Sequence, residues 1–182
     1  AVLVGPGFKR YREDVPHLGK LDEDGLKTRQ ITKELLEKHP KTKWVIDAGS
    51  LQVMDREWIP EKAIITPNRH EFELLFGDTN IKEASKLTKA TIVLKKVETE
   101  VCRDQYCTTV TGGNAGLTKG GTGDVLAGLV ASLYCNNNAF LAAKCASYIN
   151  KKAGESLFEK KGIYFNSSDL AAEIPYVMKK LI

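Results

Sequence analysis

The stretch GGNAGLTKGGTGDVLAGLVASL, residues 112–133, holds seven glycines between Gly112 and Gly128, and one carboxylate, Asp124, follows the densest group of them. Glycine adopts positive φ angles and lets a backbone approach a ligand closely. After Asp124, apolar side chains recur at helical spacing, which predicts a helix over 124–134 with one buried face. The stretch therefore predicts a glycine-rich loop leading straight into a buried helix. Its apolar face consists of Val125, Leu126, Leu129, Val130 and Leu133.

Such a helix start is suited to an anion, because its first N–H groups are free and the helix dipole is positive there. Asp124 then has two interpretations. A carboxylate in the first turn stabilises the dipole, or it acts as a general base beside a bound phosphoryl group. Gly120, Gly121 and Gly123 favour the general base, since a dipole-stabilising acid needs no glycines before it. The loop is not a Walker A motif, because Lys119 precedes the glycines.

Outward from this stretch, short apolar runs alternate with helical patterns along the chain. This alternation predicts an α/β fold in which three layers form, with helices on both sides of a largely parallel sheet. We expect one domain over residues 1–182. The expected strands lie near 1–4, 43–47, 63–68 and 90–96, with a hairpin at 99–110. The expected helices lie at 23–38, 71–76, 124–134 and 139–153, with a last one capped by Ser167 or Ser168.

Several large apolar side chains are expected to pack. The helix at 23–38 carries apolar residues at helical spacing, and four aromatic residues are interpreted as core or edge packing. These residues are Leu26, Ile31, Leu35 and Leu36 in the helix, and Trp44, Trp58, Tyr164 and Phe165 elsewhere.

Turn-forming and polar residues follow each predicted parallel strand. In open α/β sheets ligands bind at the carboxyl ends of the strands, so these segments are expected to meet on one rim with the glycine stretch. Asp47 ends a buried strand, where a carboxylate is unfavourable unless it has a partner. Three roles are open for it: binding a metal, an electrostatic role on the nucleotide side of the rim, or capping a loop. The segments are 5–7, 47–49, 66–71 and 95–96.

The composition is ordinary for a globular protein, and its mild positive charge would suit an anionic small ligand. The 182 residues are 42% hydrophobic and 27% charged, with a net charge of +4. No run of 18 apolar residues and no export leader is visible, so we expect no membrane span and a cytoplasmic location. The lysine pairs at 151–152 and 160–161 are too short for a nucleic-acid site and are interpreted as solvated surface.

The four cysteines do not have the spacing of a zinc site. Cys102 and Cys107 flank RDQY, a plausible hairpin turn, so they are expected to face each other across paired strands. Reduced thiols are the default expectation, with a disulfide as the alternative. No cysteine is interpreted as catalytic, and no side chain is assigned as a metal ligand.

Residues 113–133 resemble the signature of the ADP/ATP-dependent NAD(P)H-hydrate dehydratases, a branch of the ribokinase-like superfamily. Further segments are similar to the same family, in the same order along nearly all of the chain. They are VLVGPGFKR (2–10), WVIDAGSLQVM (44–54), IITPNRHEFELLFG (64–77), IVLKK (92–96) and FNSSDLAAEIP (165–175). The resemblance implies a ribokinase-like fold and repair of hydrated NADH or NADPH. ADP or ATP with Mg²⁺ phosphorylates the ring hydroxyl, and loss of phosphate restores the double bond.

The resemblance also implies site residues, position by position. Asp124 matches the acid placed at the hydrated ring. The positions that bind the hydrate match Gly7, Asn68, Arg69, His70 and Glu71, although Glu71 also fits a helix-dipole role and a lone His70 a surface role. The nucleotide positions match Lys95, Lys96, Val97, Glu98 and Thr99, and the loop of Asn114, Ala115, Gly116, Leu117, Thr118, Lys119, Gly120, Gly121, Thr122 and Gly123.

The chain departs from the family pattern in several places. Gly49 stands where a second acid is usual, Lys96 stands where a glycine is usual, and GNAGL replaces GNPGM. The family domain normally begins before the Gly-Pro-Gly strand. We therefore expect the fold to be incomplete at its N-terminus, and we expect the exposed sheet edge to associate with a second copy or with a separate N-terminal segment.

Two other functions remain open. A small-molecule kinase of the same superfamily would use the same loop and acid, but it would release a stable phosphorylated product. A non-catalytic nucleotide-binding subunit would bind ADP or ATP without turnover.

Overall fold

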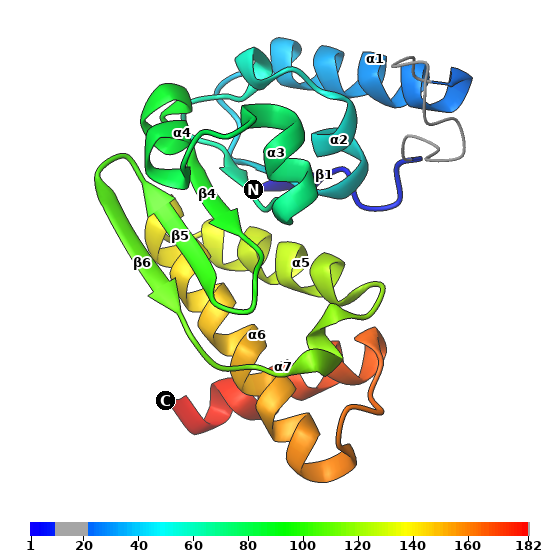
Figure 1. Cartoon of the computed structure of the whole chain (residues 1–182), viewed down its shortest axis with the longest axis vertical. Coiled ribbons are helices and arrows are strands. Elements are labelled where there is room, and N and C mark those ends of the chain that lie inside the picture. Colours follow the sequence, from blue (N-terminus) through cyan, green and yellow to red (C-terminus); the bar gives the residue numbers. More distant parts are fainter. Residues whose placement is uncertain (10–21, 182) are drawn as a thin grey trace.

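In the described part of the chain six strands form one sheet, and their order across the sheet is their order along the chain. The computed structural model describes residues 1–9 and 22–181, so Arg10, which ends the predicted first loop, lies outside the described residues (Figure 1). The strands are β1 (Val2–Val4), β2 (Trp44–Ile46), β3 (Ile64–Ile65), β4 (Thr91–Leu94), β5 (Thr99–Arg103) and β6 (Tyr106–Val110).

The first four strands are parallel, and the last two form an antiparallel hairpin on β4. Val4 lies opposite Ile46, and Ile46 lies opposite Ile65. Because parallel strands end at the same edge of a sheet, the segments that follow β1 to β4 come together. The prediction of a largely parallel sheet with a hairpin over 99–110 is confirmed.

Helices follow the strands, and some differ from the predicted bounds. The glycine-rich helix begins at Thr122, two residues earlier than expected, and the next helix runs eight residues past its expected end. Two short helices, α2 and α4, were not predicted. The α-helices are α1 (Glu23–Lys38), α2 (Ala48–Val53), α3 (Arg69–Phe76), α4 (Ile81–Thr88), α5 (Thr122–Tyr134), α6 (Ala139–Lys161) and α7 (Ser167–Leu181). Two 3₁₀ turns are η1 (Arg56–Trp58) and η2 (Ala115–Thr118).

The sheet separates two apolar cores. On one face, Trp44, Ile46 and Ile65 pack against side chains of α1 to α4. On the other face, Val45 and Ile64 pack against α5, α6 and α7. Neighbouring strand residues point to opposite faces, so each strand serves both cores. Figure 1 shows α1 to α4 on one side and α5 to α7 on the other, which confirms the predicted three layers.

The prediction for the face of α1 was partly wrong. Leu26 and Ile31 are 56% and 48% exposed. The helix turns Gly25, Thr28, Thr32 and Leu36 inward instead. Small residues let α1 lie close to α2, where the Thr32 hydroxyl is hydrogen-bonded to the Ser50 hydroxyl at 2.9 Å. Close backbone approach, rather than hydrophobicity alone, selected the buried face.

The start of α7 also differs from the prediction. Asn166, not Ser167 or Ser168, caps this helix: its side chain accepts from the Asp169 N–H at 2.9 Å, and the Asp169 carboxylate accepts from the Asn166 N–H at 3.0 Å. The preceding Phe165 is 1% exposed, as expected. Tyr164, however, is 84% exposed, so its interpretation as core or edge packing was wrong. Adjacent side chains in an extended segment point in opposite directions, and Phe165 takes the inward one.

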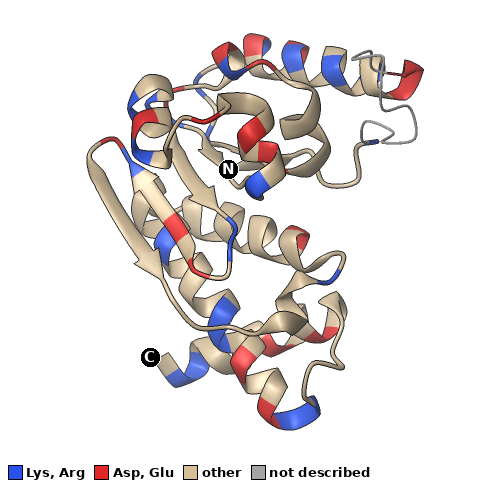
Figure 2. Ribbon diagram, viewed as in Figure 1, with Lys and Arg blue, Asp and Glu red and all other residues tan. Residues whose placement is uncertain are grey.

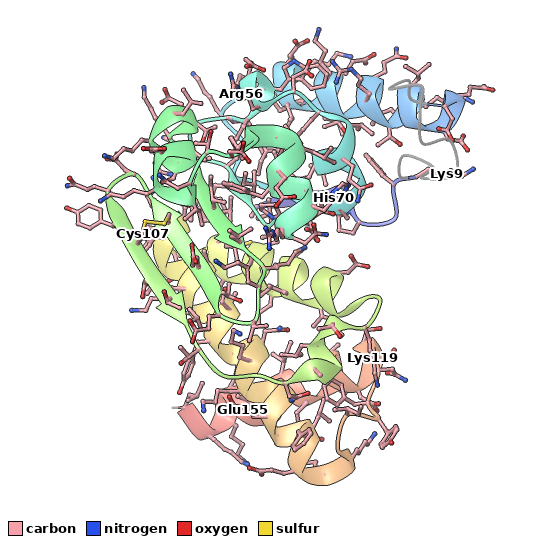
Figure 3. All side chains as sticks on the ribbon, viewed as in Figure 1. Lys9, Arg56, His70, Cys107, Lys119 and Glu155 are labelled. Atoms are coloured by element: carbon pink, nitrogen blue, oxygen red, sulfur yellow. A yellow bond between two sulfur atoms is a disulfide. The ribbon has the colours of Figure 1, made fainter. Side chains whose placement is uncertain are left out.

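Cys102 and Cys107 lie directly opposite each other on β5 and β6 and are joined as a disulfide (Figure 3). The expected position across the hairpin is confirmed, whereas the default expectation of reduced thiols was wrong for this pair. Direct cross-strand pairing places the two Cβ atoms within bonding reach. Cys135 and Cys145 are free thiols.

Charged side chains are interleaved rather than gathered, and Figure 2 shows both signs alternating along α1. Within the described parts of the chain, no helix is both long and apolar enough to cross a bilayer. The interpretation of the lysine pairs as solvated surface was wrong for Lys151, which is 6% exposed. Lys160 is only half exposed and bonds both oxygens of the buried Glu173 carboxylate at 2.6 Å.

Replacing Glu173 by glutamine tests this last contact. The hydrogen bond from Lys160 holds the pKa of Glu173 below its ordinary value. Such a carboxylate stabilises the fold above its unfolded pKa, and the stabilisation is lost as the pH falls through its folded pKa. Glu173→Gln should therefore cost about 2 kcal/mol at neutral pH, a fall in Tm of about 4–8 °C. The difference should shrink below about pH 4.

Thermal unfolding of wild type and variant from neutral to acid pH measures this effect. Glu159→Gln on the exposed face of α6 removes the same charge without such contacts and serves as the control. Equal losses in the two variants at neutral pH would contradict the prediction.

Candidate functional site

The segments that follow β1, β2, β3 and β4 meet on one rim of the sheet. A Cβ atom placed on Gly5 would lie 1.7 Å from the Asp47 carbonyl oxygen, so only glycine fits between these two loops. Asn68 pairs with Lys95 as an isolated parallel bridge. A Cβ atom on Gly123 would lie 3.4 Å from Lys95 Nζ, which brings the start of α5 to the same place. The predicted rim is therefore present in the structure.

The N-terminus of α5 differs from those of its neighbours. An Asp or Asn side chain caps α1, α3, α4, α6 and α7 by accepting a hydrogen bond from a first-turn N–H. The N-cap of α5 is Gly121, which has no side chain to do so. The Thr122 N–H donates to the Lys119 carbonyl oxygen at 3.3 Å, so among the described residues the N–H groups of Gly123 and Asp124, with the positive end of the helix dipole, are left for a ligand. A phosphate or a developing oxyanion fits this position.

Asp124 stands in the first turn of α5, at the third helical position. Its side chain is exposed, and within the described chain it makes no hydrogen bond or ion pair. A carboxylate already engaged in a cap or a salt bridge would need to break that contact before taking a proton. Asp124 needs no such step, so its geometry suits a general base next to an anion site.

The loop before α5 is held in shape by its own polar groups. The Asn114 side chain accepts from the Gly116 N–H at 2.9 Å and caps η2. The Thr122 hydroxyl donates to the carbonyl oxygens of Leu117 and Lys119, at 2.6 and 2.7 Å. A Cβ atom on Gly116 would lie 2.4 Å from the Phe165 ring, so this glycine lets the loop lie flat on the core. These contacts give the glycine stretch a defined loop conformation, so it is not a flexible linker.

Two residues of the predicted nucleotide loop are turned away from the rim. Lys119 Nζ donates to the carbonyl oxygens of Ile163 and Phe165, in the connection before α7 (Figure 3). Leu117 packs on Gly154 of α6. These two side chains support the loop and are not turned toward the rim. Ala115, Thr118 and Gly120 are exposed, and nothing lies within 4 Å of a Cβ atom on Gly120.

Lys95 supplies the positive charge on the rim. Its Nζ lies 2.7 Å from Asp47 Oδ1, and the Asp47 side chain is 1% exposed while that of Lys95 is 21% exposed. Asp47 Oδ2 is buried and has no hydrogen-bond partner among the described residues. A buried carboxylate with one free oxygen is costly, so the Lys95 ammonium is what makes Asp47 tolerable at this strand end.

The rest of the 95–99 segment forms the turn into β5. The Lys96 ammonium is paired with Glu100, Val97 is 92% exposed, Glu98 is exposed and Thr99 is buried in β5. An apolar side chain as exposed as Val97 is unusual on a rim of polar residues. The segment reaches over the rim opposite the glycine loop.

In the structure, some of the residues predicted to bind the hydrate are already engaged in structural contacts, and others are open to a ligand. Asn68 and Glu71 form a capping box at the start of α3, and the second Glu71 oxygen accepts from Gln52 at 3.1 Å. Both Glu71 oxygens are therefore occupied, and Glu71 is 2% exposed. Arg69 is paired with Glu73 on the outer surface of α3.

Two further predicted hydrate contacts are open. His70 is exposed at the beginning of α3 (Figure 3). Gly7 is also exposed, and a Cβ atom on it would meet nothing within 4 Å. Unlike the buried Glu71, these positions remain accessible to a ligand, as does Arg69, whose exposed side chain is paired with Glu73.

The structure explains one departure from the family pattern. A Cβ atom on Gly49 would lie 2.6 Å from the Phe8 carbonyl oxygen, so the loop after β1 occupies the space that an acidic side chain at position 49 would need. Asp47 is thus the single carboxylate that this segment brings to the rim.

Sequence reasoning missed Lys151. Its Nζ donates to the carbonyl oxygens of Val97 at 2.6 Å and Gly112 at 3.0 Å, the first in the predicted nucleotide segment 95–99 and the second two residues before the predicted loop 114–123. Burial lowers the pKa of Lys151. The signal available in the sequence was the position of Lys151 on α6. It lies four residues after Ser147 and four residues before Glu155, a spacing that places it on the inward face of the helix.

The chain is similar to proteins of known family and known structure. Residues 1–176 match the Carb_kinase family, described as NAD(P)H-hydrate dehydratase. Over 174 residues the chain is 41% identical to the bifunctional NAD(P)H-hydrate repair enzyme Nnr of Methanocaldococcus jannaschii, a match that covers 94% of this chain and 34% of that protein. The chain therefore spans about a third of the length of this relative.

Two solved structures resemble the fold. A ribokinase-like superfamily protein from Enterococcus faecalis superimposes with a TM-score of 0.71 at 24% identity, over 98% of this chain and 62% of that one. The ADP/ATP-dependent NAD(P)H-hydrate dehydratase of Bacillus subtilis, co-crystallized with ATP/Mg²⁺, superimposes with a TM-score of 0.66 at 24% identity, over 77% and 55%. The fold is ribokinase-like, and the chain belongs to the Carb_kinase family of NAD(P)H-hydrate dehydratases.

Proposed function

We propose that this chain carries the unit that dehydrates hydrated NADH or NADPH, using ADP or ATP. The observation that carries the proposal is the uncapped start of α5 with the unengaged Asp124 carboxylate beside it, on a rim that also holds Lys95. An anion site next to a free base is what transfer of a phosphoryl group to a hydroxyl requires. Family membership and the named activity of the relatives support the choice of substrate.

In the proposed reaction Asp124 takes the proton from the ring hydroxyl as that oxygen attacks the terminal phosphorus of ADP or ATP. The bond to the leaving phosphate of the nucleotide breaks, and AMP or ADP leaves with that electron pair. The N–H groups at the start of α5 donate hydrogen bonds to the transferring phosphoryl group. The new phosphate ester then leaves the ring as inorganic phosphate, a ring proton is lost, and the double bond is restored.

Lys95 supports the proposal from the other side of the rim. Its ammonium neutralises Asp47 and lies near Gly123, so it can also face a nucleotide phosphate at the start of α5. Of the predicted hydrate contacts, Gly7 and His70 are open to a ligand. Asn68 and Glu71 shape the wall through their capping box instead. We propose that this wall faces the nicotinamide ring.

We propose that Mg²⁺ binds together with the nucleotide. No group of three or more acidic, histidine or cysteine side chains in the described ranges is placed to hold a metal ion by itself. Mg²⁺ commonly binds through substrate phosphates, retained waters and one or two carboxylates. The unpartnered Asp47 Oδ2 fits such a role as an acceptor for one of the ion's waters. When bound, the ion would neutralise charge on the transferring phosphate.

We further propose that residues 1–182 act as one nucleotide-binding unit in the cytoplasm. Among the described residues, β1 pairs only with β2, and Val2 is 45% exposed. A strand edge without a partner favours strand addition, so we expect association with a second copy or with a separate segment. Light scattering that gave a well-folded monomer would contradict this expectation.

The test of the function uses purified protein with hydrated NADPH or NADH, Mg²⁺ and either ADP or ATP. The expected result is a nucleotide-dependent return of the absorbance of the reduced nicotinamide ring, together with one inorganic phosphate per ring restored. A stable phosphorylated product without that return would identify a kinase. Nucleotide binding without either product would identify a binding subunit, and both outcomes would overturn the proposal.

A further inference from the structure

We propose that Lys151 is a positioning residue for nucleotide binding, which holds the glycine loop and the turn after β4 at a fixed separation. The inference rests on the proposed nucleotide site. Lys151 belongs to α6, outside the sequence segments from which the family resemblance was inferred and outside the rim itself. Its contacts, rather than its sequence context, connect it to the site.

Among the described residues, the Lys151 side chain bonds both to the predicted nucleotide segment 95–99 and to Gly112, two residues before the predicted loop 114–123. Its Nζ donates to the Val97 carbonyl oxygen at 2.6 Å and to the Gly112 carbonyl oxygen at 3.0 Å. Val97 lies in the turn between β4 and β5, and Gly112 begins the glycine loop. Both acceptors are backbone atoms, so the ammonium fixes main-chain positions rather than another mobile side chain. One group thus sets the width between the two segments.

The same turn of α6 holds the next residues of the loop. The Glu155 carboxylate accepts from the Gly113 N–H at 2.9 Å, and the Gly154 carbonyl oxygen accepts from the Asn114 side chain at 2.7 Å. Figure 3 shows Glu155 on α6 beside this part of the loop. Three successive loop residues, 112 to 114, therefore bond to three positions on one helix. The contact to Val97 is what extends this support to the opposite segment.

The burial of Lys151 fits a dedicated role. A lysine that is 6% exposed has left water, and desolvation of an ammonium is unfavourable unless hydrogen bonds replace the lost water. The two carbonyl oxygens are those bonds. By contrast, Lys152 next to it pairs with Glu155 on the surface. An ordinary solvated lysine at position 151 would need neither carbonyl group.

Loss of this tie should weaken nucleotide binding selectively. Without it the two segments occupy the binding arrangement for a smaller fraction of the time, and the apparent affinity falls by that fraction. One charged hydrogen bond of this kind corresponds to about a tenfold change in an equilibrium constant. We expect Lys151→Met to raise the Kd for ADP about tenfold or more. The KM for hydrated NADH or NADPH should change by less than about twofold, since Gly7 and His70, the open positions predicted to contact this substrate, lie on other elements.

The experiment measures ADP binding by titration calorimetry with Mg²⁺, and separately KM for each substrate. Lys144→Met, which removes an exposed lysine two turns earlier on α6, is the matched control and should bind like wild type. Lys151→Arg keeps N–H donors at this position and should stay within about threefold of wild type. If Lys151→Met does not fold, Lys151→Gln, which removes the charge but keeps amide donors, should show the higher Kd.

Other outcomes would overturn the inference. These are a folded Lys151→Met protein that binds ADP like wild type, an equal rise in KM for both substrates, or a wild-type chain that does not bind ADP. The proposed function fails in a different way. If wild type binds ADP but does not dehydrate the substrate, the function is wrong, while the calorimetric comparison still decides the role of Lys151.

Discussion

Replacing Asp124 by asparagine is expected to lower kcat of the proposed dehydration by about 10²–10⁴-fold, the range that a lost general base produces. The amide keeps the size of the carboxylate but cannot take the hydroxyl proton. Since Asp124 is exposed and unbonded among the described residues, the change should leave the fold intact. The lost favourable charge at the helix N-terminus should cost stability by no more than about 1 kcal/mol.

The measurement pairs the absorbance assay with calorimetric ADP binding. ADP should bind Asp124→Asn as tightly as wild type or tighter, because a negative charge has left the neighbourhood of the phosphates. Glu83→Gln is the matched control: Glu83 is exposed and occupies the same third position in the first turn of α4. It removes the same charge from an equivalent helix position away from the rim. Comparable activity of Asp124→Asn and Glu83→Gln would rule out Asp124 as the base.

Replacing Lys95 by methionine is expected to cost about 3–5 kcal/mol of folding stability, because it leaves the buried Asp47 carboxylate without a counter-charge. Asp47 Oδ2 already lacks a partner, so both oxygens would then be unpaired. For a chain of this length the loss corresponds to a fall in Tm of roughly 6–20 °C. The variant should also lose affinity for ADP, since Lys95 lies beside the start of α5.

Thermal or denaturant unfolding of a double-mutant cycle measures this coupling. Lys95→Met combined with Asp47→Leu should recover most of the lost stability, because an apolar pair of similar shape removes the stranded charge. Lys96→Met is the control, since the adjacent Lys96 is paired with Glu100 at the surface. It should change stability by no more than about 0.5 kcal/mol. A Lys95→Met protein as stable as Lys96→Met would contradict the prediction.

Local patterns predicted the elements whose signals lie close together in the sequence. The glycines before an apolar helical face at 124–134 identified α5, and the alternation around RDQY identified the hairpin of β5 and β6. Breaker residues after four apolar runs predicted the rim. The short helix α2 was missed because its residues, AGSLQV, are small or weakly patterned, and it is formed by burial against α1 and α3.

Burial was harder to predict than secondary structure. Leu26 and Ile31 have the right spacing for a core face, yet α1 packs through Thr28 and Thr32 because small residues allow it to approach α2. Lys151 looks like a surface lysine in the sequence and is buried because two distant carbonyl groups converge on its ammonium. Whether such a residue is buried depends on which segments of the chain pack together, and the hydrophobicity of the residue alone does not predict this.

In the candidate site, too, some features were predictable from the sequence and others only from the tertiary structure. The sequence alone determined the family, the sheet type, the glycine-led start of α5 and the acid in its first turn, since each rests on residue types at short, fixed spacing. The tertiary structure decided that Asp47 is paired with Lys95, that Glu71 and Lys119 are engaged in structural bonds, and that Lys151 joins the turn after β4 to the start of the glycine stretch. These contacts join residues 39 to 54 positions apart, or, for Glu71, depend on which carboxylate oxygen is already occupied. Only the folded arrangement of the chain fixes such partners.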